Sequence, residues 1–69
     1  MNWIKVIHLK NGEVIAINIT NMSFNEIIEG INKEIESKYS IEVENDSTIY
    51  VIDIEEIAYM EVRCTNEEN

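Results

Sequence analysis

The sequence contains no proline, two glycines, one cysteine and one histidine among its 69 residues. A single cysteine cannot form an internal disulfide, and one cysteine with one histidine does not make a zinc site. Glycine-rich phosphate loops are excluded because Gly12 and Gly30 are the only glycines. The chain therefore lacks the covalent and metal supports that stabilise many small domains, and we expect no metal and no cofactor.

Basic residues are also scarce. Five Lys and Arg residues stand against fourteen Asp and Glu residues, which gives a formal net charge of −9. Direct binding of DNA or RNA depends on Lys and Arg that neutralise phosphates, so we expect no direct contact with nucleic acid. We expect no membrane association either, because no apolar run reaches the roughly 18 residues that span a bilayer. The lone cysteine and the absence of a signal-peptide pattern favour a cytoplasmic protein.

The length predicts one small domain over residues 1–64, followed by a disordered acidic tail at residues 65–69. A domain of this size buries only about 60% of its unfolded surface, so its core is thin. Without a disulfide or a metal, such a chain is either a well-packed monomer or an oligomer.

The stretch HLKNGEVIAI, residues 8–17, has Asn-Gly between two apolar segments and predicts a β-hairpin. A two-residue turn at Asn11 and Gly12 places Leu9 opposite Val14. In this register the two faces of the hairpin are both apolar. The core face holds Ile4, Val6, His8, Ile15, Ile17 and Ile19, and the second face holds Trp3, Ile7, Leu9, Val14 and Ala16.

The second face of this hairpin predicts an interface, because one apolar face is enough to cover a small core and exposed apolar patches mark contact surfaces. We expect a homo-oligomer, with a dimer as the first choice. A different partner, or the last strands of the same chain, are the alternatives for covering this face.

The stretch MSFNEIIEGINKEIESKY, residues 22–39, predicts an amphipathic helix that packs on one face of the sheet. Ser23 and Glu26 have the spacing of a capping box at the start of a helix. Gly30 lies inside this helix and off its apolar stripe, and we interpret it as tolerated there. The stripe consists of Phe24, Ile27, Ile28, Ile31 and Ile35.

Three further strands complete the predicted fold. Apolar and polar side chains alternate over residues 39–44, which predicts a strand with Tyr39, Ile41 and Val43 facing inward. Residues 48–53 are more continuously apolar, which is typical of a central strand covered on both sides. A single helical turn at residues 54–57 then leads into a last strand. That strand presents Ala58, Met60, Val62 and Cys64 on one face and Tyr59, Glu61 and Arg63 on the other.

The order β-β-α-β-β-β predicts a small α+β domain with an antiparallel sheet and one helix. Nothing in it indicates catalysis. His8 has no visible nucleophile or orienting partner, and we interpret it as a half-buried structural residue opposite Ile15. We interpret Cys64 as a small buried hydrophobic residue. The stretch EVENDS, residues 42–47, lacks the length and the glycine of a calcium-binding EF-hand loop.

The acidic surface is the remaining functional feature. An array of carboxylates can take the place of nucleic-acid phosphates in a basic site, so we predict a non-catalytic binding protein that inhibits a nucleic-acid-processing protein. In its length, acidity and abundance of Ile and Asn, the chain resembles the small inhibitors that phages of low-GC bacteria carry. The predicted contact residues are Glu26, Glu29, Glu36, Glu42, Glu44, Asp46, Glu55, Glu56 and Glu61.

Two other functions fit the composition. The first is a homo-oligomer that binds a small signalling nucleotide, whose phosphates would need Lys5, Lys10 and Arg63 from several subunits. The second is a structural subunit whose acidity only confers solubility.

Overall fold

A computed structural model of the chain describes residues 2–37 and 39–65. The predicted α+β class and the order β-β-α-β-β-β are confirmed. The strands form two antiparallel sheets, one with the order β2-β1-β5 and one made of β3 and β4. The elements are β1 (Asn2–Leu9), β2 (Val14–Thr20), α1 (Phe24–Ser37), β3 (Ser40–Asn45), β4 (Thr48–Asp53), the 3₁₀ turn η1 (Ile54–Glu56) and β5 (Ile57–Cys64).

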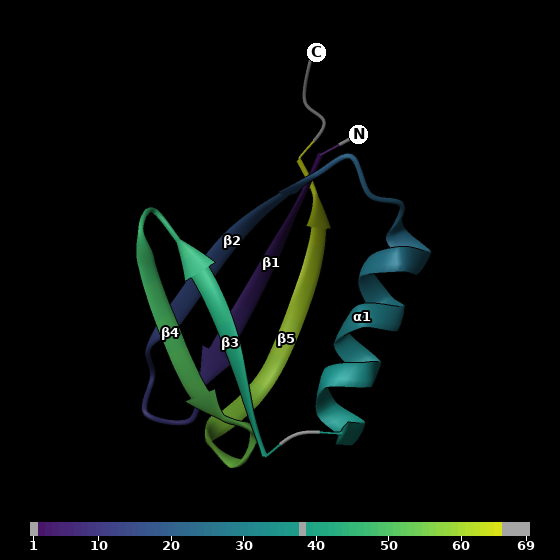
Figure 1. Cartoon of the computed structure of the whole chain (residues 1–69). Coiled ribbons are helices and arrows are strands. Elements are labelled where there is room, and N and C mark those ends of the chain that lie inside the picture. The colour runs from purple at the N-terminus through teal and green to yellow at the C-terminus, as the bar shows by residue number, and fades with distance from the viewer. Residues whose placement is uncertain (1, 38, 66–69) are drawn as a thin grey trace.

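The α1 helix and the β3–β4 hairpin lie on the same side of the three-stranded sheet (Figure 1). The core lies between the sheet and the hairpin, where buried Ile7 and Ile15 meet the buried side chains of Ile41, Val43 and Ile52. At the other end of β1, the indole of Trp3 packs on the ring of Phe24 with the ring centroids 5.4 Å apart. The opposite side of the three-stranded sheet, here called the outer sheet face, carries neither the helix nor the hairpin.

The first hairpin has a three-residue turn rather than the predicted two-residue turn. The Leu9 N–H donates to the Glu13 carbonyl at 2.8 Å, and the Gly12 N–H donates to the Leu9 carbonyl at 3.0 Å. Gly12 has a φ of 98°, the conformation that glycine supplies in such a turn. As a result, His8 lies opposite Val14 and not opposite Ile15.

This shift of one residue moves the side chains of β1 to the face opposite the predicted one. Ile7, Leu9, Ile15 and Ile17 belong to the core or pack against it. The core face predicted for β1 is therefore wrong, because its even-numbered side chains lie on the outer sheet face. The outer sheet face holds Ile4, Val6, His8, Val14, Ala16, Asn18, Tyr59, Glu61 and Arg63.

The helix begins as predicted. The Ser23 backbone N–H donates to Glu26 Oε1 at 2.8 Å, and the Glu26 N–H donates to Ser23 Oγ at 3.2 Å, which is the reciprocal pairing of a capping box. Within the predicted stripe Ile27 is buried, whereas Phe24 and Ile35 at its two ends are each 45% exposed. The helix thus packs on the sheet mainly through the middle of its apolar stripe.

The β3–β4 hairpin turns at Asp46 and Ser47, whose positive φ values of 51° and 67° suit a tight two-residue turn. Ile41 faces the core as predicted, but Tyr39 is 98% exposed, so its predicted inward position is wrong. The prediction of a central β4 is also wrong. Among the described strands β4 pairs only with β3, and Ile52 is its one buried residue.

The final strand follows the predicted helical turn and pairs antiparallel with β1. Met60 lies opposite Ile7, and Glu61 lies opposite Val6, so the predicted alternation holds from Tyr59 onward. Before Tyr59 the register shifts, because Leu9 pairs with Ile57, and Ile57 rather than the predicted Ala58 packs against the core. Cys64 is exposed, contrary to its predicted burial. Of the predicted tail only Thr65 is described, and its N–H donates to the Asn2 carbonyl at 3.0 Å. Within the described part of the chain, no helix is long and apolar enough to cross a membrane.

Candidate functional site

The outward side of the β3–β4 hairpin combines exposed aliphatic side chains with carboxylates. Val51 lies opposite Glu42, and Ile49 lies opposite Glu44. Residues directly opposite each other in an antiparallel pair share one face, so these four side chains form a single surface, here called the hairpin face. Ile49 and Val51 are each 66% exposed. The alternation of β3 had already placed the two glutamates outward, but the exposure of β4 was not predicted.

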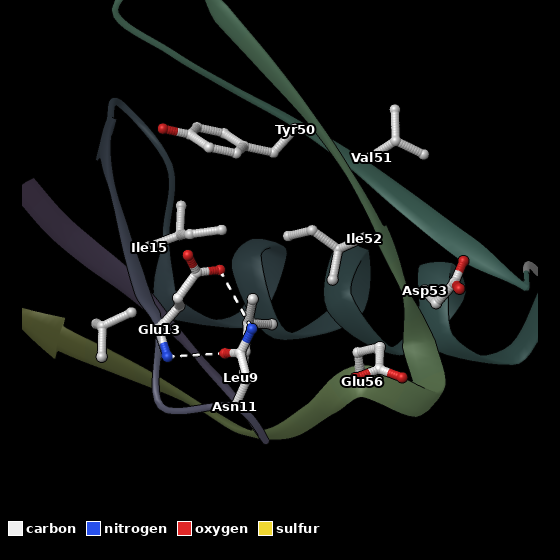
Figure 2. A pocket seen from close by; sticks show the side chains of 10 residues that line it. Leu9, Asn11, Glu13, Ile15, Tyr50, Val51, Ile52, Asp53 and Glu56 are labelled. Atoms are coloured by element: carbon white, nitrogen blue, oxygen red, sulfur yellow. Dashed lines mark hydrogen bonds between the residues drawn. The ribbon is translucent and has the colours of Figure 1, made fainter.

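A cleft of about 480 Å³ opens beside the hairpin, between the start of β2 and the second half of β4 (Figure 2). Its apolar lining includes Leu9, Ile15 and Ile52. Its acidic lining consists of Glu13, Asp53 and Glu56, and no Lys, Arg or His is among the described residues that line it.

The turn of the first hairpin positions one of the cleft carboxylates. Asn11 Oδ1 accepts a hydrogen bond from the Glu13 backbone N–H at 2.9 Å. Asn11 Nδ2 also donates to Glu13 Oε1 at 3.4 Å, and Figure 2 shows both bonds. An asparagine that bonds the backbone two residues ahead is typical of tight turns. The same turn that fixes the register of β2 therefore holds Glu13 at the mouth of the cleft.

A polar cluster occupies the outer sheet face. His8 Nε2 and Glu61 Oε1 are 2.7 Å apart, and Arg63 Nη2 donates to the same oxygen at 3.1 Å. The hydrogen bond from His8, followed by that from Arg63, lowers the pKa of Glu61 below its usual value. The ring of Tyr59 stacks on His8, with centroids 4.1 Å apart. The carboxylate of Glu61 is therefore engaged within the chain.

This cluster supplies the partner of His8 that the sequence did not reveal. The histidine is half-buried as predicted, but on the outer sheet face, where its cross-strand neighbours are Val14 and Tyr59. A carboxylate bonded to imidazole can orient a general base, yet general-base catalysis also needs a positioned substrate or nucleophile. Neither neighbour is a serine or a cysteine, and the pair bridges β1 and β5 on a sheet surface.

The structure distributes the nine predicted acidic contact residues over several elements. Glu26 accepts a hydrogen bond from the Ser23 backbone N–H at the start of α1, and Glu61 lies on the outer sheet face. The other seven are exposed, but only two of them flank the exposed aliphatic side chains of β4. Glu29 and Glu36 lie on α1, Glu42 and Glu44 on β3, Asp46 in the hairpin turn, and Glu55 and Glu56 in η1.

The five residues predicted for self-association do not share a face. Trp3, Ile7 and Leu9 are on the side of the sheet that the helix and the β3–β4 hairpin cover, and Ile7 is fully buried. Val14 and Ala16 lie on the outer sheet face instead. Tyr59, which was not predicted to belong to this set, joins them there at 55% exposure.

The three basic residues considered for nucleotide binding are also separated. Lys5 lies near the helix, Lys10 in the first turn, and Arg63 on the outer sheet face. No group of three or more His, Cys, Asp or Glu residues in the described segments has a geometry that could hold a metal ion.

Comparison of the chain with protein-family models, with curated proteins and with solved structures found no match.

Proposed function

We propose that the protein is a non-catalytic binding protein whose hairpin face docks on a basic site of another protein. The observation that carries this proposal is the cross-strand arrangement of Glu42 and Glu44 with Val51 and Ile49, whose aliphatic side chains are each 66% exposed. An apolar centre beside charged groups is the usual composition of a specific protein interface.

Burial explains why these side chains favour a partner. Covering an exposed Ile or Val stabilises a complex by about 1.5–3 kcal/mol for each side chain that becomes fully buried. The neighbouring carboxylates supply selectivity, because they attract Lys and Arg and repel acidic surfaces. A net charge of −9 adds long-range attraction toward a basic partner.

The class of partner follows from the chemistry of carboxylates. Lys and Arg sites that bind phosphate also bind carboxylate, and Arg does so with two parallel hydrogen bonds. A protein that handles nucleic acid presents such sites on its surface. We therefore propose that the hairpin face occupies the basic groove of a nucleic-acid-processing protein and inhibits it.

The proposal is tested by affinity capture from a lysate of the source organism. The wild type is compared with the variant Glu42→Lys/Glu44→Lys and with the control Glu29→Lys/Glu36→Lys, which changes the net charge equally on α1. We expect the wild type and the control to retain the same basic protein, the hairpin variant to lose it, and excess duplex DNA to displace it. Equal retention by the hairpin variant would contradict the proposal.

A second copy of the chain is the partner that we propose for the outer sheet face. Val14 and Tyr59 are 56% and 55% exposed there. Glu61, the only carboxylate on this face among the residues that the structure describes, is engaged by His8 and Arg63. Two molecules of an acidic protein repel each other least through such a surface.

A further inference from the structure

The cleft beside the β3–β4 hairpin is flanked by two strand edges. Among the described strands, β2 pairs only with β1, and β4 pairs only with β3. Each strand therefore has one edge that no other strand covers. The cleft is lined by Val14 and Ile15 from β2 and by residues 50–53 from β4 (Figure 2). Uncovered edges present backbone N–H and C=O groups that can pair with another chain.

A hydrogen bond identifies which backbone groups of β2 point away from β1. Asn45 Nδ2 donates to the Ala16 carbonyl at 2.8 Å, so the backbone of Ala16 is directed to the uncovered edge. Backbone groups along an antiparallel strand point alternately to the two sides. Val14, two residues earlier, therefore presents its N–H and C=O to the same edge, next to the cleft.

The same reasoning applies to β4. Its tight turn pairs Asn45 with Thr48, and the closing pair of a two-residue hairpin is hydrogen bonded. Every second residue of the strand points its N–H and C=O to the same side, so those of Tyr50 and Ile52, like those of Thr48, point toward β3. The backbone of Val51 is consequently directed away from β3, on the side of β4 that no described strand covers.

The lining of the cleft selects the side chains of an incoming strand. Leu9, Ile15 and Ile52 provide apolar contacts, whereas Glu13, Asp53 and Glu56 provide negative charge with no basic residue in the described lining. The volume of about 480 Å³ is within the range of sites that bind ligands. Side chains of an extended strand alternate between its two sides, so a segment with alternating basic and apolar residues matches this lining.

We propose that the cleft binds an extended, basic segment of a protein partner, which adds to the uncovered edge of β2 at Val14. The inference rests on the proposed function, because the segment belongs to the basic protein that docks on the hairpin face. Backbone hydrogen bonds supply the pairing, and the three carboxylates select lysine or arginine side chains.

The probe for this site is the blocked hexapeptide Lys-Val-Lys-Val-Lys-Val, titrated into the isotopically labelled protein and followed by NMR. We expect saturable shifts at the amides of Val14, Ile15 and Val51, together with slower hydrogen exchange at Val14. The matched control is the same peptide with alternate backbone nitrogens methylated, which keeps its charge and its side chains. We expect it to bind at least about tenfold more weakly, because a methylated nitrogen cannot donate a backbone hydrogen bond.

Two variants separate this site from the hairpin face. Glu13→Gln/Glu56→Gln should weaken hexapeptide binding several-fold, whereas Glu42→Gln/Glu44→Gln should leave it unchanged.

Equal binding of the methylated peptide, or no binding of the hexapeptide, would overturn the inference. If the captured partner binds the Glu13→Gln/Glu56→Gln variant normally but not the Glu42→Lys/Glu44→Lys variant, the cleft proposal fails and the proposed function stands. Normal binding of the captured partner by the Glu42→Lys/Glu44→Lys variant contradicts the proposed function itself.

Discussion

Gly12 determines which side chains of the first hairpin face the core. Its φ of 98° places it in a backbone region that other residues rarely adopt, and it completes the three-residue turn between β1 and β2. Gly30 has a different role, because it lies inside α1 with a helical backbone. A Cβ added at Gly30 would meet no heavy atom of its surroundings within 4 Å.

The two glycines give opposite predictions for the same substitution. Gly12→Ala should lower the free energy of unfolding by about 1 kcal/mol, because alanine is strained at a positive φ. Gly30→Ala should raise it by about 0.5–1 kcal/mol, because alanine favours the helix and has room there. Urea unfolding followed by the fluorescence of Trp3 measures both. A stabilised Gly12→Ala protein would contradict the three-residue turn.

The pairing of β1 with β5 brings Glu61 to His8, 53 residues away in the sequence. A carboxyl group whose pKa is lower in the folded protein than in the unfolded chain stabilises the fold above its unfolded pKa. This stabilisation is lost as the pH falls through the folded pKa. The hydrogen bonds from His8 and Arg63 lower the pKa of Glu61, so its contribution is complete above pH 4.5 and disappears in more acid solution.

The substitution Glu61→Gln tests this link between the strands. We expect the variant to be less stable than the wild type above pH 4.5, and we expect the difference to shrink as the pH falls below that value. Urea unfolding at a series of pH values provides the measurement. A difference in stability that does not change with pH would mean that the ionised form of Glu61 does not hold the two strands together.

Elements specified by local signals were predicted from the sequence. The helix starts at its capping box because Ser23 and Glu26 satisfy each other's backbone groups without help from the rest of the fold. The turn of the first hairpin was assigned one residue too short, because Asn11-Gly12 is compatible with two-residue and three-residue loops. That single ambiguity reversed the two faces of β1 and so misplaced His8 together with the self-association residues of β1, which are Trp3, Ile7 and Leu9.

Features that depend on distant contacts were not predicted. The apolar stretch of β4 resembled a covered central strand, because periodicity does not distinguish a buried strand from an exposed edge strand. The cluster around Glu61 needs the register between β1 and β5. The cleft joins the first turn to β4, which lies far from that turn in the chain. Its acidic residues were visible in the sequence, but their convergence was not.

The whole molecule has two unlike sides. The hairpin face carries exposed aliphatic side chains next to carboxylates, whereas on the outer sheet face the carboxylate of Glu61 is engaged by His8 and Arg63. The acidic side therefore suits a basic partner, and the outer sheet face suits a second acidic molecule. The hairpin face belongs to β3 and β4, whereas the outer sheet face belongs to β1, β2 and β5.

Substitutions at two exposed valines distinguish the contact with a second copy from the contact with a basic partner. Val14→Lys on the outer sheet face should convert a dimer into a monomer, because it puts a charge into an apolar contact. Val51→Lys on the hairpin face is the matched control and should leave the dimer intact. Sedimentation velocity over a range of concentrations measures both variants. A wild-type protein that stays monomeric at the highest concentration reached would contradict self-association through this face.

Recognition of a basic partner through the hairpin face is tested most directly by titration calorimetry with the purified captured protein. We expect similar affinities for the wild type and for Glu29→Lys/Glu36→Lys. We expect an affinity at least about 30-fold weaker for Glu42→Lys/Glu44→Lys, since interfacial charge reversal costs about 2 kcal/mol or more. Equal affinities for all three proteins would contradict recognition through the hairpin face.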